Sequence, residues 1–258
     1  MEIAVLQAAT LARRAVIRTA RQPANIVFPL IFPMLLFAVN SGGLRSETRL
    51  QGFPTNSFVA FAIAVPFIQG ALLATVNANV EFARDIQTGF LNRLALTPVR
   101  GLVLLVGQLG GLLTIALVQA VFYLVVGYAF GVRLATGPAG WLMLLLLETV
   151  IALAFASFGT WAALRTGSTE AVQGLFPVFF VFLFLSSANI PRNLIETDWF
   201  RWVATANPVS YLIEAVRSLA IYDWYWEPIL LGFAVAIGLS MVGFTLATHA
   251  LIERMARS

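Results

Sequence analysis

Long apolar blocks alternate with short polar segments along this chain. The block from Leu102 to Gly131 contains no charged residue. The hydrocarbon core of a bilayer is about 30 Å thick, so about 20 apolar residues in a helix span it. The blocks are continuously apolar and lack the alternation of barrel strands, which favours helices. The pattern predicts six spans, at about Ile26–Val39, Phe58–Val80, Leu102–Phe130, Trp141–Leu164, Ala171–Asn189 and Ile229–Ala250.

Composition agrees with an all-α integral membrane fold. Of 258 residues, 60% are hydrophobic and 11% are charged, whereas soluble domains carry roughly 25% charged residues. The chain has no cysteine, which excludes disulfides, thiol redox chemistry and cysteine metal sites. Its single histidine, His249, has no second histidine to share a metal ion. We therefore expect neither a metal site nor a catalytic centre on this chain.

The basic residues indicate the orientation of the spans. All 16 are arginines, and the net charge is +4. Ten arginines fall in segments on one side, which keeps an excess of +5 after its acidic residues are counted, and the other side is neutral. The positive-inside rule then places both termini in the cytoplasm, in a multi-pass protein of the cell membrane. Scattered arginines favour this topological explanation over nucleic-acid binding.

The N-terminal segment, residues 1–22, is predicted to form an amphipathic helix along the membrane. On a helical wheel Ala12 and Val16 share one face, and Arg14 and Arg18 share the opposite face. The basic face would meet anionic lipid headgroups. The alternatives are a basic flank without defined structure and a cleaved signal peptide. The basic region exceeds the length of a signal peptide and no good cleavage site follows, which weighs against the latter.

The loop after the second span predicts a short cytoplasmic helix at residues 84–96. Ile86, Phe90 and Leu94 recur every four residues and form one apolar stripe. Pro98 ends the helix. A helix connected rigidly to two long spans could bind a soluble partner. The alternative interpretation is that this helix is only an interfacial linker.

The segment 191–227, after the fifth span, is too long for a turn and too apolar for a solvated tail. Asn207-Pro208 is a break signal, and proline suits the first turn of a helix. We predict two short re-entrant helices that enter the outer leaflet without crossing it. Glu214 and Arg217 are three residues apart and could pair on the wet face. A seventh, partial span is the alternative.

Few polar residues lie inside the spans. Glu148 is the one charged residue deep within a predicted span, where an ionised side chain costs at least about 2.5 kcal/mol. It could be a proton or substrate site, or a protonated side chain inside the protein. Gln69, Asn77 and Gln119 could line a translocation path, although packing between helices is the more ordinary role.

Two segments carry recognisable motifs. Their residues are Arg84, Asp85, Gly89, Leu94, Thr97, Pro98 and Val99 in the first loop, and Asn207, Pro208, Val209, Ser210, Tyr211, Glu214, Ala215, Val216 and Arg217 in the second. Together the two segments resemble the permease subunit of type-2 ABC exporters of the daunorubicin and multidrug efflux kind. Asp85 stands where that family more often has Glu.

The resemblance implies an ATP-driven exporter subunit with two copies of an ABC ATPase and a second, identical or similar permease. ATP and magnesium would sit on the ATPase. A P-loop requires a lysine that reaches the phosphates, and this chain has none, so the ATPase would be another polypeptide. Glu81, Arg84 and Asp85 would make polar contacts with it, while Phe90 and Leu94 pack.

Two other functions remain open from the sequence. A secondary transporter could use Glu148 as its proton carrier, although internal repeats typical of such folds are not evident. A non-transporting assembly or sensor subunit is the third possibility. For an exporter, the sparse interior polar groups favour a hydrophobic or amphipathic substrate, such as a drug, a lipid or a lipid-linked molecule.

Overall fold

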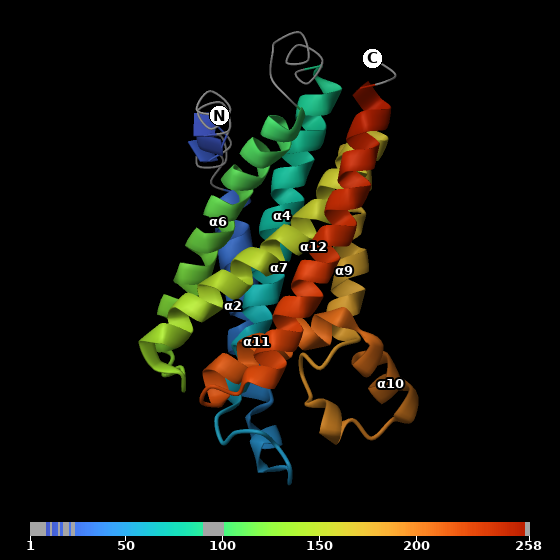
Figure 1. The fold of residues 1–258 in the computed structure, drawn as a ribbon. Helices are drawn as coiled ribbons and strands as arrows, with labels where there is room; N and C mark the ends of the chain where they lie inside the picture. The colour runs from blue at the N-terminus through green and yellow to red at the C-terminus, as the bar shows by residue number, and fades with distance from the viewer. Residues whose placement is uncertain are drawn as a thin grey trace.

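The computed structural model describes residues 9–10, 12–14, 16–17, 21, 24–89 and 101–255. Within these residues the fold is a bundle of long helices (Figure 1). Five helical stretches are long and apolar enough to cross a membrane. They are α2 (Ala24–Gly43), α3 (Phe58–Ala62) together with α4 (Ala64–Gln87), α6 (Gly101–Ala129), α7 (Gly137–Thr166) and α12 (Trp226–Met255).

Shorter helices complete the described chain. They are the 3₁₀ turns η1 (Arg45–Arg49) and η2 (Arg192–Leu194), and the α-helices α8 (Thr169–Gln173), α9 (Leu175–Phe184), α10 (Asp198–Ala206) and α11 (Pro208–Ile221).

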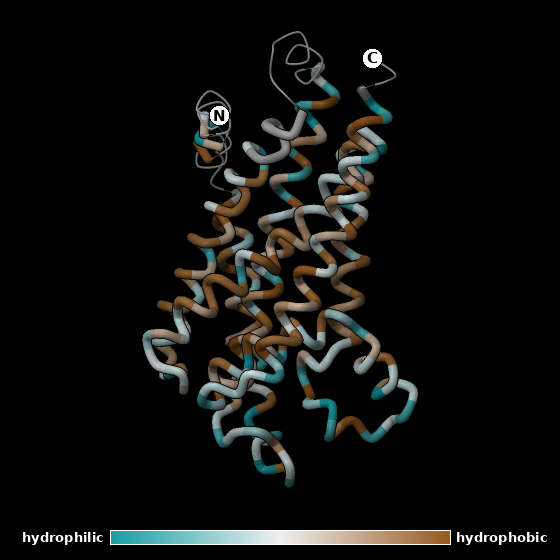
Figure 2. Tube along the Cα trace, in the orientation of Figure 1, coloured by the Kyte–Doolittle hydropathy of each residue, from teal (hydrophilic) through white to brown (hydrophobic). Residues whose placement is uncertain are grey.

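The two ends of the bundle carry different elements (Figure 1). At one end, called here the terminal end, α4 and α12 finish and α6 begins. The other end, called the cap end, carries η1, α10 and α11. The long helices run alternately between these ends (Figure 1). Colouring by hydropathy shows apolar residues along the helices and polar residues gathered toward both ends (Figure 2), as expected for helices that cross a bilayer.

Prolines explain two breaks in the helices. A proline lacks the N–H that would bond to the carbonyl four residues earlier. Pro66 therefore cannot donate to the carbonyl of Ala62, and α3 ends at that residue before α4 begins. Pro177 likewise cannot donate to the carbonyl of Gln173, and α8 ends there before α9 begins.

The core is centred on α4 and α11. Every residue of α4 from Ala64 to Thr75 is buried, and α7 packs along both α4 and α12. On α11, the side chains of Leu212, Ile213 and Val216 are completely buried. At 14 residues α11 is about 21 Å long, which is too short to cross the hydrocarbon core. It is therefore a buried, non-spanning helix at the cap end.

The predicted fifth span, Ala171–Asn189, is wrong at its carboxyl end. The helical stretch runs from Thr169 to Phe184, about 24 Å at 1.5 Å per residue, and a series of turns and bends follows it. The described residues thus contain five helices of spanning length, with a shorter apolar stretch in the fifth place.

The predicted start of the cytoplasmic helix at Arg84 is also wrong. The helix of the second span does not end near Val80 but continues without interruption to Gln87. Arg84 and Asp85 therefore lie in its last turns. The remainder of the predicted 84–96 helix beyond Gly89 lies outside the described residues, as do most residues of the predicted 1–22 helix.

Candidate functional site

The terminal end of α4 gathers the first set of candidate residues. Glu81 is buried, and its carboxylate pairs with the exposed Arg84 at 2.7 Å, one helical turn away. Asp85 lies 3.6 Å from Arg14 of the N-terminal segment. Arg84 keeps more than half of its side chain exposed, so a charged group faces solvent at the tip of a helix whose body is buried.

Gly89 terminates α4. Its φ of +69° lies in the left-handed region, which glycine adopts without the strain of a Cβ. Its N–H donates to the carbonyl of Ile86 at 3.1 Å, in the manner of a helix C-terminal motif. Gly89, one of the residues behind the family resemblance, therefore serves to end the helix. Phe90, Leu94, Thr97 and Pro98, the other candidates in this loop, lie outside the described residues.

A small apolar cluster holds the end of α4 against its neighbours. Its buried members are Val80, Phe82, Ala83 and Ile86 of α4, Ala162, Ala163 and Leu164 of α7, Val172 of α8, and Ala247, Ala250 and Leu251 of α12. Arg254 also donates to the carbonyl of Leu164 at 3.0 Å, and Arg165 pairs with Glu253. The last turns of α4 are consequently joined to α7 and α12.

Asn207 defines the ends of two helices at once. Its side-chain oxygen accepts from the N–H of Val209 at 2.9 Å and caps the start of α11. Its amide nitrogen donates to the carbonyls of Phe182 and Leu185, at 2.6 and 3.0 Å, where α9 ends. Pro208 occupies the first turn of α11, where its missing N–H costs no hydrogen bond. The Asn-Pro pair thus fixes α11 to the end of α9.

The spacing of Glu214 and Arg217 predicted an ion pair on the wet face of the helix. In the structure Arg217 is buried and binds other groups. It is only 5% exposed, and its guanidinium lies 3.5 Å from the ring centroid of Phe61. Three of its N–H groups donate to the carbonyls of Phe61, Ser187 and Ala188, at 3.2, 3.1 and 2.9 Å. A buried cation is tolerated where hydrogen bonds compensate its lost hydration, and here these bonds join α11 to α3 and to the turn after α9.

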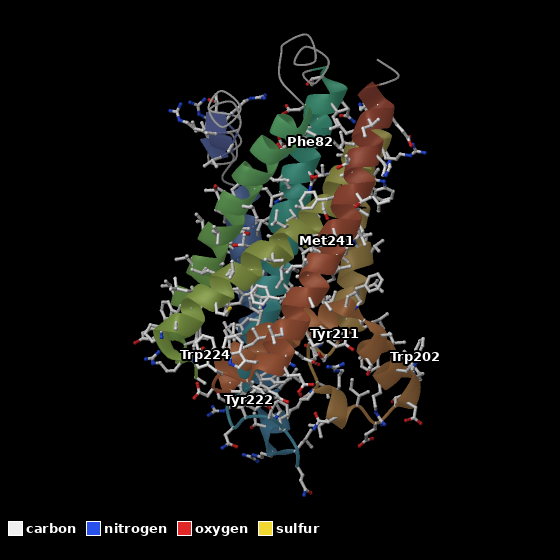
Figure 3. The ribbon with its side chains drawn as sticks, in the orientation of Figure 1. Phe82, Trp202, Tyr211, Tyr222, Trp224 and Met241 are labelled. Carbon is white, nitrogen blue, oxygen red and sulfur yellow. The ribbon has the colours of Figure 1, made fainter. Side chains whose placement is uncertain are left out.

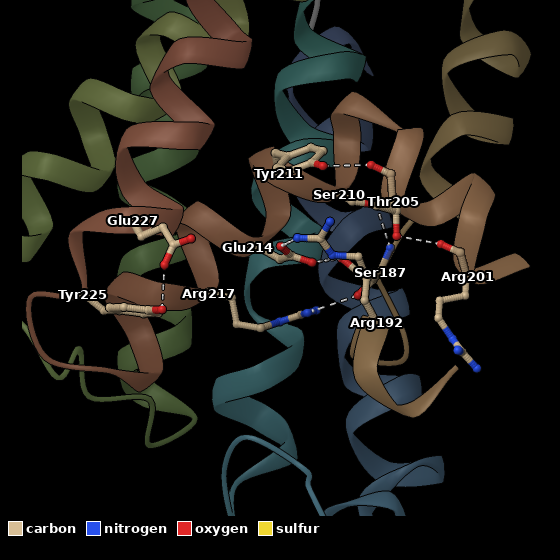
Figure 4. Close-up of polar contacts among 10 residues, drawn as sticks. All are labelled: Ser187, Arg192, Arg201, Thr205, Ser210, Tyr211, Glu214, Arg217, Tyr225 and Glu227. Carbon is tan, nitrogen blue, oxygen red and sulfur yellow. Dashed lines mark hydrogen bonds and ion pairs between the residues drawn. The ribbon is translucent and has the colours of Figure 1, made fainter. Parts of the chain in front are cut away.

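Glu214 binds other partners (Figure 4). It pairs with Arg192 and accepts from the hydroxyl of Ser187 at 2.9 Å. Burial alone would lower the pKa of Arg192, but the bond to Glu214 offsets this effect and raises the pKa above its ordinary value. Arg192 therefore stays protonated at neutral pH.

Tyr211 completes this arrangement. Its ring lies 4.7 Å from the guanidinium of Arg192, and its hydroxyl donates to the carbonyl of Thr205 at 2.9 Å. Sequence reasoning missed Arg192 and Ser187. Neither residue lies in a helical pattern, so no periodicity in the sequence pointed to them.

The polar candidates of the spans lie in the interior of the protein. Gln69, Gln119 and Glu148 are at most 4% exposed, and each keeps at least one side-chain oxygen or nitrogen without a hydrogen-bond partner among the described residues. Asn77, the fourth candidate, is half-buried. Gln69, Gln119 and Glu148 thus sit within the helix packing of one chain, and their place along a translocation path stays a prediction.

Asn79, which the sequence did not single out, joins α4 to α7. It is fully buried, donates to the carbonyl of Ala156 at 3.3 Å, and accepts from the hydroxyl of Thr160 at 2.9 Å. Asn77 and Asn79 are two residues apart and therefore point to different sides of the helix. Composition alone could not indicate which of the two faces the core.

Comparison with known proteins identifies the family. Residues 6–221 match the model of the family described as "ABC-2 type transporter". The chain belongs to this family. The match includes the end of α4, the Asn-Pro break and all of α11, so both candidate sites lie within the family domain. The chain is accordingly the permease subunit of a type-2 ABC transporter and a multi-pass membrane protein.

Curated relatives of this ABC-2 permease cover most of its length. "Putative transport permease ycf38" of Porphyra purpurea is 25% identical over 95% of the chain and 88% of the relative. "Probable doxorubicin resistance ABC transporter permease protein DrrC" of Mycobacterium tuberculosis is 26% identical over 81% of the chain and 74% of the relative. Family membership implies an ABC ATPase as a partner in the transporter.

Proposed function

We propose that this permease exports a hydrophobic or amphipathic molecule across the cell membrane. Two copies of an ABC ATPase on a separate chain would supply the energy, and a second permease, identical or similar, would complete the complex. Both termini and the end of α4 would face the cytoplasm. The excess of arginine on that side supports this orientation.

The observation that carries the proposal is the continuity of α4. One helix leads from the buried core to a charged tip, where Glu81 is buried, Asp85 is partly buried and Arg84 is exposed. Interiors are close-packed and transmit displacement. A push on this tip by an ATPase would therefore move the core of the permease, and with it α7 and α12.

Two observations support the substrate class. The described interior holds few charged side chains, and the large apolar faces of α2, α6 and α12 are exposed, so a substrate could reach the protein from the lipid. The relative from Mycobacterium tuberculosis carries doxorubicin resistance in its name, and an amphipathic drug would fit the same class.

Charge reversal at Arg84 tests the coupling role. In a co-purified complex, Arg84→Glu should leave ATP hydrolysis within about twofold of the parent, while transport of doxorubicin or of a fluorescent short-chain phospholipid into inside-out vesicles falls about tenfold, equivalent to about 1.4 kcal/mol of lost coupling. The reason is that the substitution disrupts the pair with Glu81 and presents the wrong charge to the ATPase.

Arg49→Glu, an exposed reversal on η1 at the cap end, is the matched control and should leave both activities unchanged. An Arg84→Glu complex that assembles and transports at the parental rate would remove the tip of α4 from the coupling mechanism.

A second candidate function, proton-coupled transport through Glu148, has one supporting observation. This carboxyl group is 1% exposed, and one of its oxygens has no hydrogen-bond partner in the described part of the chain. The ATP requirement of transport distinguishes the two functions.

A further inference from the structure

A cavity opens at the cap end beside the charged residues of the re-entrant segment. Its volume is about 310 Å³, and its lining includes Pro54, Phe61, Arg192, Glu214, Arg217 and Tyr225. These residues come from the loop after η1, from α3, from η2, from α11 and from the approach to α12. Ligand pockets in proteins begin at about this volume.

The charge of the cavity is unbalanced. Its lining contains two guanidiniums and one carboxylate, and that carboxylate, on Glu214, pairs directly with Arg192. The hydrogen bonds of Arg217 go to neutral carbonyls, and none of the ion pairs found in the described part of the chain includes it.

A guanidinium carries five N–H donors, and three of those on Arg217 are used. The lining of the cavity therefore carries a net charge of +1, and two N–H groups of Arg217 remain beyond these three bonds. A buried cation without a counterion is costly, so an anion bound here would be stabilised by both the charge and the donors.

The position of the cavity indicates which class of anion could reach it. Tyr222 and Tyr225 line it, and Trp224 lies at the same end of the bundle as Tyr222 (Figure 3). The rings of Trp224 and Trp226 stack at 5.2 Å between centroids. Tryptophan and tyrosine collect at the headgroup level of membranes, which is the depth of phospholipid phosphates.

We propose that this cavity binds the phosphate of a phospholipid, with Arg217 as the principal cation and Arg192 as a second one. Guanidiniums bind phosphate oxygens through charge-assisted, often bidentate hydrogen bonds. The proposal does not depend on the transported substrate. It describes a lipid-binding site on the permease itself, at the end opposite the tip of α4.

Binding to purified permease in dodecyl maltoside tests the site, with calorimetry as the measurement. The probes are dioctanoyl phosphatidic acid, dioctanoylglycerol, which lacks the phosphate, and inorganic phosphate. We expect the phosphatidic acid to bind and dioctanoylglycerol not to bind. Inorganic phosphate that competes at concentrations comparable to those of the lipid would indicate a site for soluble anions and overturn the assignment to lipid.

Two variants should change the affinity in opposite directions. Arg192→Gln removes a positive charge from the lining and should weaken phosphatidic acid binding about tenfold, whereas Glu214→Gln removes the negative charge and should tighten it about tenfold. Arg49→Gln, an exposed arginine at the same end and outside the cavity lining, is the matched control and should bind as the parent does.

Thermal melting of each variant reports whether it is folded. Glu214→Gln is close in shape to the original side chain, so it tests the charge argument even if Arg192→Gln fails to fold. Equal binding of phosphatidic acid and dioctanoylglycerol, or a Glu214→Gln variant that is folded and binds no more tightly than the parent, would overturn the proposal.

Discussion

Asn207 and Arg217 act on main-chain carbonyls, and this is why their roles were difficult to predict. Asn207 has both a donor and an acceptor in one side chain, so it can end α9 and begin α11 together. Arg217 distributes its N–H groups over three carbonyls from two distant segments. Every residue has a main-chain carbonyl, so the residue types do not indicate which carbonyls a side chain will bind. The partners of Asn207 and Arg217 could therefore not be predicted from the sequence.

Glu148 permits a test at the scale of a single residue. Glu148→Gln keeps the shape of the side chain and removes its proton exchange. Under the ATP-driven function, vesicles carrying the variant complex should transport at close to the parental rate and only with ATP. Melting of the variant in detergent should occur at the same or a higher temperature, because a buried ionisable group is costly in a membrane span.

The measurement is the initial rate of transport with ATP, without ATP, and with an imposed pH gradient. Gln69→Glu, which adds an acidic group to the buried part of α4, serves as the opposite change and should lower the melting temperature. Transport that persists without ATP and disappears in Glu148→Gln would favour the proton-coupled function.

The backbones of α11 and α12 approach each other closely at Gly232. A Cβ added to Gly232 of α12 would lie 2.3 Å from the Cβ of Ala215 and 3.1 Å from the carbonyl oxygen of Tyr211. Neither atom belongs to a flexible side chain, so α11 and α12 would have to move apart. The glycine thus allows α11 to pack directly on α12.

Gly232→Ala should therefore destabilise the protein by about 1–3 kcal/mol, the usual cost of overpacking, and lower its melting temperature. Gly238→Ala in the same helix is the control. A Cβ there meets no atom within 4 Å, so the better helix propensity of alanine should leave stability unchanged or raise it by up to about 1 kcal/mol. The measurement is the thermal unfolding of each purified variant, followed by tryptophan fluorescence. Equal melting of the two variants would contradict the packing argument.

Across the whole molecule, the alternating helices place the end of α4 and the cap at opposite ends (Figure 1). The absence of cysteine from the sequence makes single-cysteine labelling free of background. Ser46 of η1 and Thr88 after α4 are both exposed, and they lie at the cap end and the terminal end respectively.

In intact cells, Ser46→Cys should react with a membrane-impermeant maleimide, whereas Thr88→Cys should react only after permeabilisation, because the cap end is proposed to face outward. The measurement is the labelled fraction of each variant before and after permeabilisation. Each variant controls for the other, and the reverse pattern would invert the proposed orientation.

Much of the fold was predictable because hydrophobic length is a property of the sequence. The first four spans and the last follow from their apolar blocks, and five stretches of the described chain have spanning length. The error in the fifth span has a local reason. Its block is apolar up to Leu185, but Ser186, Asn207 and Arg217 donate to the carbonyls of Leu183, Leu185 and Ala188 respectively and hold a turn there.

The sequence by itself determined an all-helical membrane protein, the likeness to type-2 ABC permeases, and the segments that do not span. Periodicity and composition suffice for the helices and the non-spanning segments because each depends on neighbouring residues, whereas the likeness rests on two short motifs, at Arg84–Val99 and Asn207–Arg217. Tertiary structure alone decided which polar side chains meet: Asn79 rather than Asn77 between α4 and α7, Arg192 rather than Arg217 beside Glu214, and the cavity that these choices leave. Such contacts join residues far apart in the chain, and their geometry exists only once the helices have packed.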